Sequence, residues 1–506
     1  MLNKALKVLL TDIVDEHVLS TLSEISISNI ELDSRLIMNN GLFVALNGAQ
    51  TDGRLYIESA IKQGAVAILV DADETLDTSQ LNNNQLENNN VPIIQVVNLN
   101  SHLSDIASRF YNYPQNDLSL IGITGTNGKT TVNQLIGQWL TLLGKKVYCM
   151  GTLGNGLYDQ LTDSPNTTLN ALDLIAHLAK AKELNAEYVV MEVSSHGLSL
   201  DRVKALHFDI AAFTNLSQDH LDFHGSMQAY SDAKLQLFTP EYSNKFVLNG
   251  NDDVAKSWMK NWQEKQDNVD LCCFNQSNDL ANVNINAIDV VYSNKGINGS
   301  LVINDHVYKL ESKLLGMFNL DNLLTALSCM YSAGFAIEKL VSTMAMLNPV
   351  MGRMEVFTND KSPCVVVDYA HTPDALKQAL LSLRVHCTGY LWVVFGCGGD
   401  RDNTKRSLMA SMAEQYADKV IFTQDNSRNE TPSIIFSQML DGIKNKDAIT
   451  IEYERMTAVQ NAIQNADIND IVLLAGKGHE NYQILQSGRI DYDERAFALK
   501  TVTNLL

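Results

Sequence analysis

The sequence predicts an α/β protein with a small α/β N-terminal domain, a central parallel-sheet domain carrying a phosphate-binding loop (P-loop), and a Rossmann-like C-terminal domain. Three observations predict this class. The 506 residues exceed what one ordinary hydrophobic core can organise. Short apolar runs alternate with helical segments, as in parallel sheets. The pattern starts afresh near Asn348-Pro349, and we expect domains over residues 1–105, 106–345 and 346–506.

The composition is typical of a globular protein, with 45% hydrophobic and 19% charged residues. The net charge is −20 and no basic run is present, so the sequence argues against nucleic-acid binding. A bound nucleotide needs only a local positive site and is compatible with this charge. No apolar stretch approaches the roughly 20 residues that span a bilayer, so we expect no membrane insertion.

The seven cysteines are odd in number, scattered and without metal-ligand spacing. This favours free thiols in a reducing compartment. The first residues are soon interrupted by acidic side chains and lack the features of a signal peptide. We therefore expect a cytoplasmic protein.

The first domain is predicted to be a small sheet with helices. Its expected strands cover residues 41–46, 65–70 and 91–97, and its expected helices cover residues 56–63 and 103–111. Asp33-Ser-Arg35 marks a turn before the first of these strands. The Asn-rich stretch 71–90 predicts an exposed loop without chemistry.

The central domain opens on residues 118–143, which predict an apolar strand, a glycine turn and an amphipathic helix. Glycines let several backbone N–H groups point at one anion, and the helix N-terminus adds partial positive charge. Lys129 can reach the terminal phosphates of a nucleotide, and the Thr130 hydroxyl can bind Mg²⁺. Ile123 stands where the usual P-loop has glycine, so the loop is the compact Gly125–Thr131. The alternative is a glycine turn that binds nothing.

The remaining central elements place polar residues at strand ends, where open α/β sheets carry their sites. We expect strands over residues 146–150, 187–192, 210–214 and 245–249, helices over residues 171–184, around 230–234 and over 319–333, and a β-hairpin within 284–311. Glu192 ends one strand and is a plausible Mg²⁺ carboxylate. Asp219–His224 concentrates carboxylates and imidazoles, for which zinc binding by His220 and His224 is the rival hypothesis.

The third domain is predicted to hold a buried parallel sheet. Its expected strands cover residues 365–368, 391–395, 419–423 and 471–475, separated by helices. No glycine-rich dinucleotide fingerprint opens this domain, so NAD is not expected.

Four motifs give the sequence a resemblance to a known family. They are Gly125-Thr-Asn-Gly-Lys-Thr-Thr131, Met191-Glu-Val-Ser-Ser-His-Gly197, Asn215-Leu-Ser-Gln-Asp-His-Leu-Asp222 and Asp368-Tyr-Ala-His-Thr-Pro373. They resemble the Mur ligases, ATP-dependent amide-forming enzymes of peptidoglycan precursor synthesis. The most similar branch adds the third peptide residue to UDP-N-acetylmuramoyl-L-alanyl-D-glutamate. The resemblance extends from Asp33 to Glu480.

The resemblance implies a UDP-binding N-terminal domain, a central ATPase and a C-terminal amino-acid domain, expected as a monomer. The D-glutamate carboxylate would attack the γ-phosphate of ATP, and the incoming amine would then displace phosphate from the acyl phosphate. The implied cofactors are ATP, as co-substrate, and Mg²⁺. The implied catalytic residues are Lys129, Glu192, His220 and Lys234, and the implied metal-binding residues are Thr130, Glu192, His220 and Lys234, the last as a carbamate.

Substrate contacts are implied position by position. For ATP they are Gly125, Thr126, Asn127, Gly128, Lys129, Thr130, Thr131, Asn319, Asn322, Arg353 and Asp368. For the UDP substrate they are Leu32, Ser34, Ala49, Gln50, Thr51, Asn166, Thr167, Thr168, Ser194 and Arg202. Asn319 and Asn322 could instead cap a helix, and Lys234 could be an exposed helical lysine. Leu200 replaces a glutamine common in the family, which removes one polar contact.

The added amino acid is implied to be meso-diaminopimelate. Family members that add it carry Asp-Asn-Pro-Arg where this chain has Asp425-Asn-Ser-Arg428, and a guanidinium can bind the second carboxylate bidentately. The full implied set is Arg401, Asp425, Asn426, Ser427, Arg428, Gly476 and Glu480. Alternatives are L-lysine as the added residue, a sister activity such as folate polyglutamylation or D-glutamate addition, and a non-catalytic P-loop nucleotide-binding protein.

Overall fold

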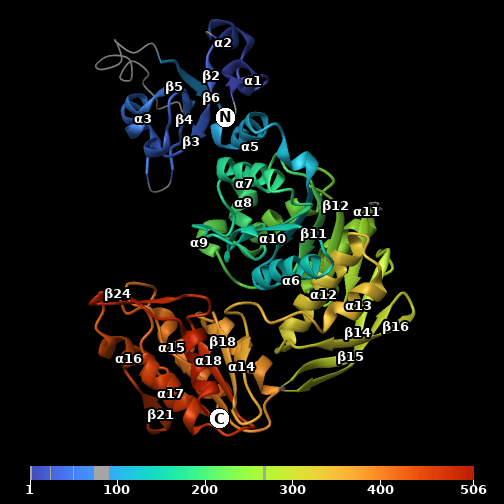
Figure 1. The fold of residues 1–506 in the computed structure, drawn as a ribbon, viewed down its shortest axis with the longest axis vertical. Helices are drawn as coiled ribbons and strands as arrows, with labels where there is room; N and C mark the ends of the chain where they lie inside the picture. The colour runs from blue at the N-terminus through green and yellow to red at the C-terminus, as the bar shows by residue number, and fades with distance from the viewer. Residues whose placement is uncertain are drawn as a thin grey trace. The chain divides into compact units, whose positions relative to one another are not determined.

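Parallel sheets that alternate with helices make up most of the chain, which confirms the predicted α/β class (Figure 1). The computed structural model describes residues 3–22, 24–48, 51–72, 91–265, 269–293 and 295–505. Two compact units result, one of Met1–Leu248 with Asp252–Leu271 and one of Asn249–Asn251 with Cys272–Leu506. Their boundary falls inside the predicted central domain, so the boundaries near residues 105 and 345 stay predictions.

In the first unit, the N-terminal sheet is fully parallel, in the order β3-β4-β5-β6. The strands are β3 (Asn29–Glu31), β4 (Gly41–Ala45), β5 (Ala65–Asp71) and β6 (Ile93–Val96), with helices α3 (Ile57–Gln63) and α5 (Leu99–Phe110). The strands β1 (Lys4–Ala5) and β2 (Ser26–Ile27) and the short helices α1 (Leu6–Leu10) and α2 (Glu16–Thr21) precede them. Phe43, Ile68 and Val70 of this sheet share a hydrophobic core with residues of α3. The predicted turn is present, because Asp33 accepts the N–H of Arg35 at 3.0 Å.

The larger sheet of the same unit has the strand order β12-β11-β7-β10-β8-β9. Its strands are β7 (Ser119–Thr124), β8 (Val147–Gly151), β9 (Gly154–Leu157), β10 (Tyr188–Glu192), β11 (Phe208–Phe213) and β12 (Ser243–Asn249). Its helices are α6 (Lys129–Leu142), α7 (Ala171–Glu183), α8 (Ser195–Ser199), α9 (Leu221–His224), α10 (Met227–Leu235) and α11 (Asp253–Lys265). β7 lies between β10 and β11 and is parallel to both, so three strand ends meet at the P-loop.

In the second unit, the predicted hairpin is a three-stranded antiparallel meander of β14 (Val283–Ser293), β15 (Gly296–Ile303) and β16 (His306–Ser312). The third strand forms because Asn304 and Asp305 adopt left-handed backbone conformations and make a second tight turn. Strand β13 (Asp270–Phe274) pairs with β14. Helices α12 (Met317–Ser332) and α13 (Ile337–Met344) follow.

The C-terminal sheet has the order β17-β18-β22-β19-β20-β21 and confirms the predicted buried parallel strands. Its strands are β17 (Glu355–Phe357), β18 (Cys364–Asp368), β19 (Leu391–Phe395), β20 (Lys419–Phe422), β21 (Ile449–Ile451) and β22 (Ile471–Ala475). Its helices are α14 (Pro373–Arg384), α15 (Thr404–Tyr416), α16 (Pro432–Leu440), α17 (Arg455–Asn465) and α18 (Glu494–Thr503), and β23 (Tyr482–Leu485) pairs with β24 (Gly488–Asp491).

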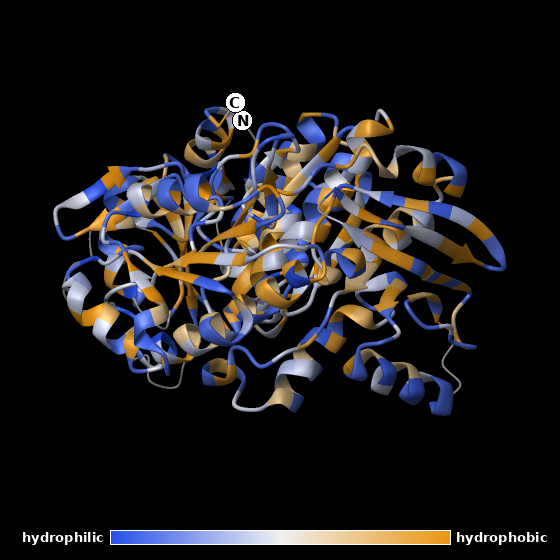
Figure 2. Ribbon diagram, turned by 90° about the horizontal axis from the view of Figure 1, so that it is seen from below, coloured by the Kyte–Doolittle hydropathy of each residue, from blue (hydrophilic) through white to orange (hydrophobic). Residues whose placement is uncertain are grey.

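Both faces of this C-terminal sheet are buried. Val366 packs into one hydrophobic cluster, whereas its neighbours Val365 and Val367 pack into the other. Because alternate residues face opposite clusters, the strands are hydrophobic throughout, as the mostly orange strands in Figure 2 illustrate. Within the described ranges, none of the helices combines the length and apolar character that a membrane span requires.

A buried ion pair ties the strand ends of this sheet together. The Arg455 guanidinium donates to Glu494 at 2.5 and 2.9 Å, and neither side chain is exposed. Arg455 also donates to the carbonyl of Ala475, the last residue of β22, at 2.9 Å and to that of Gln424, beyond the end of β20, at 3.3 Å. The pair therefore fixes the spacing of two loops that leave the sheet.

We predict that Arg455→Met destabilises the protein by about 3–5 kcal/mol, because it leaves the Glu494 carboxylate buried without its cation. The midpoint of urea unfolding measures this. Glu58→Gln, which breaks the exposed pair with Lys62, should leave the midpoint nearly unchanged. An Arg455→Met protein as stable as the wild type would contradict the role given to the pair.

Candidate active site

The P-loop connects β7 to α6 through a backbone that only glycine adopts easily. Gly125 has a φ of +147° and Gly128, the residue before α6, has a φ of +88°. A Cβ atom at Gly125 would lie 1.9 Å from Thr214 Oγ1. The first N–H groups of α6 have no partner within the helix, and its N-terminus carries partial positive charge. The loop thus has the form of an anion site, as predicted.

The end of β11 holds this loop in place. Thr126 N–H donates to the Asn215 carbonyl at 2.8 Å, and Asn127 N–H donates to Asn215 Oδ1 at 3.1 Å. The Thr214 hydroxyl donates to the Asn127 carbonyl at 2.6 Å. The sequence placed Asn215 in a motif without assigning it a contact, and nothing in the sequence singled out Thr214.

Two lysines converge on one carbonyl oxygen. Lys129 Nζ and Lys234 Nζ each donate to Gly125 O at 2.9 Å, and Lys129 also donates to Thr126 O at 2.9 Å. Lys234 is 1% exposed, and its Nζ lies 4.5 Å from the centre of the Tyr230 ring. Burial, and then the charge of Lys129, lower the pKa of Lys234 well below its usual range. The surface-lysine alternative for Lys234 is therefore wrong.

Glu192 is a buried carboxylate, 1% exposed, that faces the start of α6. It accepts from the Thr130 hydroxyl at 3.0 Å and from Thr152 N–H at 2.8 Å and hydroxyl at 3.2 Å. Carboxylate and hydroxyl oxygens are ligands that suit Mg²⁺, so the Thr130–Glu192 pair fits such an ion. Thr152 was missed in the sequence, although it follows β8, the strand beside β10.

His220 precedes the short helix α9 with a φ of +52°. Its ring packs edge-on against the ring of His196, with 4.8 Å between the ring centres. Its Nε2 lies 3.5 Å from Asp219 Oδ2. The described part of the chain contains no group of three His, Cys, Asp or Glu residues placed to hold a metal ion, so the zinc hypothesis gains no support.

Part of the predicted UDP-substrate set gathers beside Glu192. The Thr168 hydroxyl donates to the Glu192 carbonyl at 2.9 Å and accepts Ser194 N–H at 2.9 Å, and Arg202 donates to Thr168 O at 2.9 Å. The Thr167 hydroxyl lies 3.1 Å from that of Thr152.

The other predicted UDP contacts are dispersed along the first unit. Leu32 and Ser34 follow β3, Thr51 follows β4, and Asn166 lies in the exposed loop before Thr167. No hydrogen bond in the described ranges links Leu32, Ser34 or Thr51 to the Thr168 group. Ala49 and Gln50 lie outside the described residues.

The remaining predicted ATP contacts lie in the second unit as two pairs. Asn322 donates to Asn319 Oδ1 at 2.9 Å inside α12; the N-cap position is Gly316, so the capping alternative is wrong. The Arg353 guanidinium lies 4.7 Å from the centre of the Tyr369 ring. Burial raises the pKa of the Asp368 carboxyl, while Arg353 opposes this shift.

The predicted specificity loop follows β20. Arg428 has a left-handed φ of +49°, its N–H donates to Ile484 O at 3.0 Å, and its Nη1 donates to Gly399 O at 2.8 Å. Arg401 flanks the same loop. Both arginine side chains lie beside Gly398, since a Cβ atom placed there would be 3.1 Å from Arg428 Nη1 and 3.8 Å from Arg401 Cγ. The structure therefore brings the two predicted guanidinium residues together.

Ser427, where family members carry proline, is buried, and its N–H donates to the Asp425 carbonyl at 3.1 Å. Proline has no N–H and could not make this bond. The turn therefore gains a hydrogen bond that the family's proline could not make.

An ion pair that the sequence did not reveal braces this loop. Arg406 is fully buried and donates to Glu430 at 2.8 and 3.0 Å and to Gly398 O at 2.9 Å. Glu430 in turn accepts Asp400 N–H at 2.6 Å. The pair links residues 398–400 to the segment that follows Arg428.

Asp425, Asn426 and Glu480 form a hydrogen-bonded cluster around Lys477. Lys477 Nζ lies 3.1 Å from Asp425 Oδ1, 2.7 Å from Asn426 Oδ1 and 3.1 Å from Glu480 Oε2. A Cβ at Gly476 would lie 2.6 Å from Asp425 Oδ2, so only glycine allows this approach. Lys477 follows Gly476 directly in the sequence, but no role was predicted for it.

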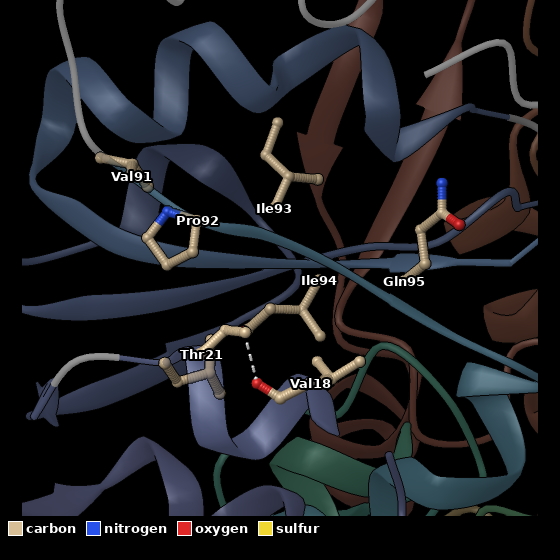
Figure 3. A pocket seen from close by; sticks show the side chains of 8 residues that line it. Val18, Thr21, Val91, Pro92, Ile93, Ile94 and Gln95 are labelled. Atoms are coloured by element: carbon tan, nitrogen blue, oxygen red, sulfur yellow. Dashed lines mark hydrogen bonds between the residues drawn. The ribbon is translucent and has the colours of Figure 1, made fainter. Parts of the chain in front are cut away.

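A separate hollow lies beside the edge strand β6, lined by Val18, Thr21, Leu22 and residues 91–95 (Figure 3). The Thr21 hydroxyl, in the wall of this hollow, donates to the Val18 carbonyl at 2.7 Å. It contains none of the predicted site residues and no titratable side chain.

Comparison with known proteins gives a consistent result. Three family models match: Mur ligase family, catalytic domain (residues 26–111), Mur ligase middle domain (123–330) and Mur ligase, glutamate ligase domain (352–478). The chain is 45% identical over 477 residues to the UDP-N-acetylmuramoyl-L-alanyl-D-glutamate--2,6-diaminopimelate ligase of Vibrio vulnificus (strain YJ016), covering 94% of each chain.

Two further relatives carry the same name. The one from Haemophilus influenzae (strain ATCC 51907 / DSM 11121 / KW20 / Rd) is 42% identical over 480 residues, covering 94% of this chain and 96% of the relative. A solved structure of such a ligase matches with a TM-score of 0.69 at 34% identity, covering 94% of this chain and 95% of that chain.

We predict that Gly125→Ala weakens binding of a nucleoside triphosphate about tenfold or more, because the methyl group collides with Thr214 and strains the loop by about 1–3 kcal/mol. Isothermal titration calorimetry with a non-hydrolysable analogue measures the affinity. Gly144→Ala is the matched control, since Gly144 also has a positive φ (+77°) but has open space around it. Equal affinities for the two variants would show that the loop does not hold the phosphates.

Proposed function

Since this chain belongs to the Mur ligase family, we propose that it joins meso-diaminopimelate to UDP-N-acetylmuramoyl-L-alanyl-D-glutamate with hydrolysis of ATP to ADP and phosphate. Two relatives with this activity in their names are 45% and 42% identical over 94% of the chain. The reaction belongs to peptidoglycan precursor synthesis.

The observation that carries the choice of amino acid is the position of Arg428. Its guanidinium is fixed by Gly399 O at 2.8 Å beside a cluster that contains Asp425 and Glu480. meso-Diaminopimelate differs from lysine by a second carboxylate, and a guanidinium binds a carboxylate bidentately. The Arg428 cation beside the carboxylates of Asp425 and Glu480 therefore suits the distal end of meso-diaminopimelate, which carries both a carboxylate and an ammonium group.

The phosphoryl donor is ATP, held by the P-loop. Lys129 and the N-terminus of α6 place positive charge where the triphosphate oxygens would lie. The D-glutamate side-chain carboxylate then attacks the γ-phosphorus, the bond to the β-phosphate oxygen breaks, and ADP leaves. The amine of diaminopimelate attacks the resulting acyl phosphate, loses a proton and expels phosphate, which forms the amide.

The main barrier to the first step is repulsion between a carboxylate and a triphosphate. Lys129 offsets part of this repulsion directly. Thr130, Glu192, His220 and carbamylated Lys234 would hold Mg²⁺, which would supply further positive charge on the phosphate oxygens. The Thr130–Glu192 contact supports the first two of these assignments.

Lys234 is proposed to carry a carbamate. Its amine is buried, and its lowered pKa favours the neutral form, which is the form that adds CO₂. Addition forms an N–C bond and releases a proton, which turns the side chain into an anion. Asn319, Asn322, Arg353 and Asp368 are proposed to complete the ATP site, and the residues around Thr168 and Ser194 to bind the UDP substrate.

We place the reaction in the cytoplasm, where ATP is present and where seven free cysteines stay reduced. The monomeric state stays a prediction that size-exclusion chromatography with light scattering can test.

We predict that the protein, given ATP, Mg²⁺, UDP-N-acetylmuramoyl-L-alanyl-D-glutamate and meso-diaminopimelate, releases phosphate in step with amide formation. Replacing diaminopimelate with L-lysine should lower the rate at least about tenfold, because the partly buried Arg428 guanidinium is left without its carboxylate. A coupled phosphate assay measures both rates.

Three variants sharpen this assay. Arg428→Met should raise the KM for diaminopimelate, whereas Arg384→Met, which changes a half-exposed guanidinium on α14, should not. Lys129→Ala should abolish turnover. Equal or faster turnover with lysine would contradict the amino-acid assignment, and nucleotide binding without any product would favour the non-catalytic alternative.

A second prediction concerns Lys234. Isotope-labelled bicarbonate should give a carbamate carbon signal in NMR spectra of the wild type that is missing in Lys234→Met. Because carbamate formation releases a proton, the signal should weaken as the pH falls and return when the pH is raised. Lys204→Met, an exposed lysine of the same unit, should keep the signal. Absence of the signal in the wild type above neutral pH would contradict the modification.

A further inference from the structure

Lys477 occupies the centre of the proposed amino-acid site, where nothing so far gives it a role. The side chain is fully buried between Gly476 and Gly478, beyond the end of β22. Its Nζ is within 3.1 Å of oxygens from Asp425, Asn426 and Glu480. An ammonium group has three donors, so these three contacts use all of them.

The contacts orient each partner. Asn426 Oδ1 accepts from Lys477 and from Ile484 N–H at 2.9 Å, which leaves its Nδ2 to donate to Glu480 Oε2 at 3.1 Å. The amide therefore cannot flip without losing hydrogen bonds at both ends. Asp425 Oδ1 accepts Asn426 N–H at 2.6 Å in addition to its contact with Lys477.

The same ammonium sets the charge of this cluster. One lysine and two carboxylates leave it with a single net negative charge. Burial alone would raise the pKa of Asp425, but Lys477 and Arg455 outweigh burial and lower it. The Arg455 charge is already balanced by Glu494, so Lys477 is the cation that faces the two carboxylates of this cluster.

The orientation leaves one oxygen for a ligand. In the described part of the chain, the polar contacts of the Glu480 side chain are all made by Oε2. Oε1 belongs to a side chain that is 17% exposed and can accept from a bound ammonium group. A cation on the ligand would neutralise the remaining charge of the cluster.

We propose that Lys477 is the positioning residue for the added amino acid, holding Asp425, Asn426 and Glu480 in place and limiting their cluster to one negative charge, which matches one ammonium group of the substrate. This rests on the proposed function, and it extends it to a residue that need not touch the substrate. Arg428 selects the carboxylate, and the cluster around Lys477 selects the ammonium beside it.

The test compares steady-state kinetics of the wild type, Lys477→Met and Lys477→Arg. Lys477→Met removes the charge and should raise the KM for diaminopimelate at least about tenfold while leaving the KM for ATP and for the UDP substrate within about twofold. Lys477→Arg keeps the charge and should recover part of the affinity. Lys500→Met, on the exposed face of α18, is the control and should behave as the wild type.

A pH series separates charge from shape. Without Lys477, two carboxylates face each other, so one takes up a proton more readily and acidification restores the single negative charge. The ratio of variant to wild-type KM should therefore fall as the pH is lowered from about 9 to about 6. Other charged or titratable groups act on these carboxylates in both proteins and cancel in the ratio; they include Tyr369, His371, Cys397, Arg455 and Tyr482. Arg353 acts in turn on Tyr369, and Arg428 and Arg489 act on Tyr482, in both proteins.

The outcomes are distinct. An inactive wild type overturns the proposed function and this inference with it. An active wild type with an unchanged KM for diaminopimelate in Lys477→Met overturns the inference alone, and a pH-independent ratio reduces Lys477 to a packing role. If Lys477→Met does not fold, Lys477→Gln, which keeps an N–H donor without charge, takes its place with the same expectations.

Discussion

The carbonyl oxygen of Gly125 is the point on which the P-loop region depends. It accepts hydrogen bonds from Lys129, at the start of α6, and from Lys234, on α10. A side chain at residue 125 would force this backbone to shift, because its Cβ would lie 1.9 Å from Thr214 Oγ1. One glycine thus allows a strand, two helices and the end of β11 to meet. Two ammonium groups on one oxygen also repel each other, which favours loss of charge at the more buried lysine.

Much of this arrangement could be predicted because it is local in the sequence. The P-loop, Lys129 and Thr130 are contiguous, and Glu192 ends a strand whose apolar run is plain. The limits of most strands were predicted to within a few residues, since buried parallel strands are hydrophobic throughout. The meander was underestimated because its second turn, at Asn304-Asp305, contains no glycine.

The contacts that could not be predicted are those that pair a buried arginine with a carboxylate far away in the chain. Arg406 meets Glu430, and Arg455 meets Glu494, across 24 and 39 residues. A charged residue in a sequence is most often exposed, so neither pair stands out before the fold is known. The contacts of Lys477 could not be predicted for the same reason, because its three partners lie on two loops that are separate in the sequence. His220 differs, because its proposed role as a metal ligand rests on the motif, while the described contacts place its ring against that of His196.

The backbone at Arg428 has an evolutionary consequence. A left-handed conformation costs a residue with a side chain roughly 1–2 kcal/mol, and glycine or asparagine would adopt it more easily. Mutational drift toward either of these residues would therefore make the loop more stable while removing the guanidinium. Backbone stability and the proposed recognition of the substrate carboxylate are therefore opposed at this single position.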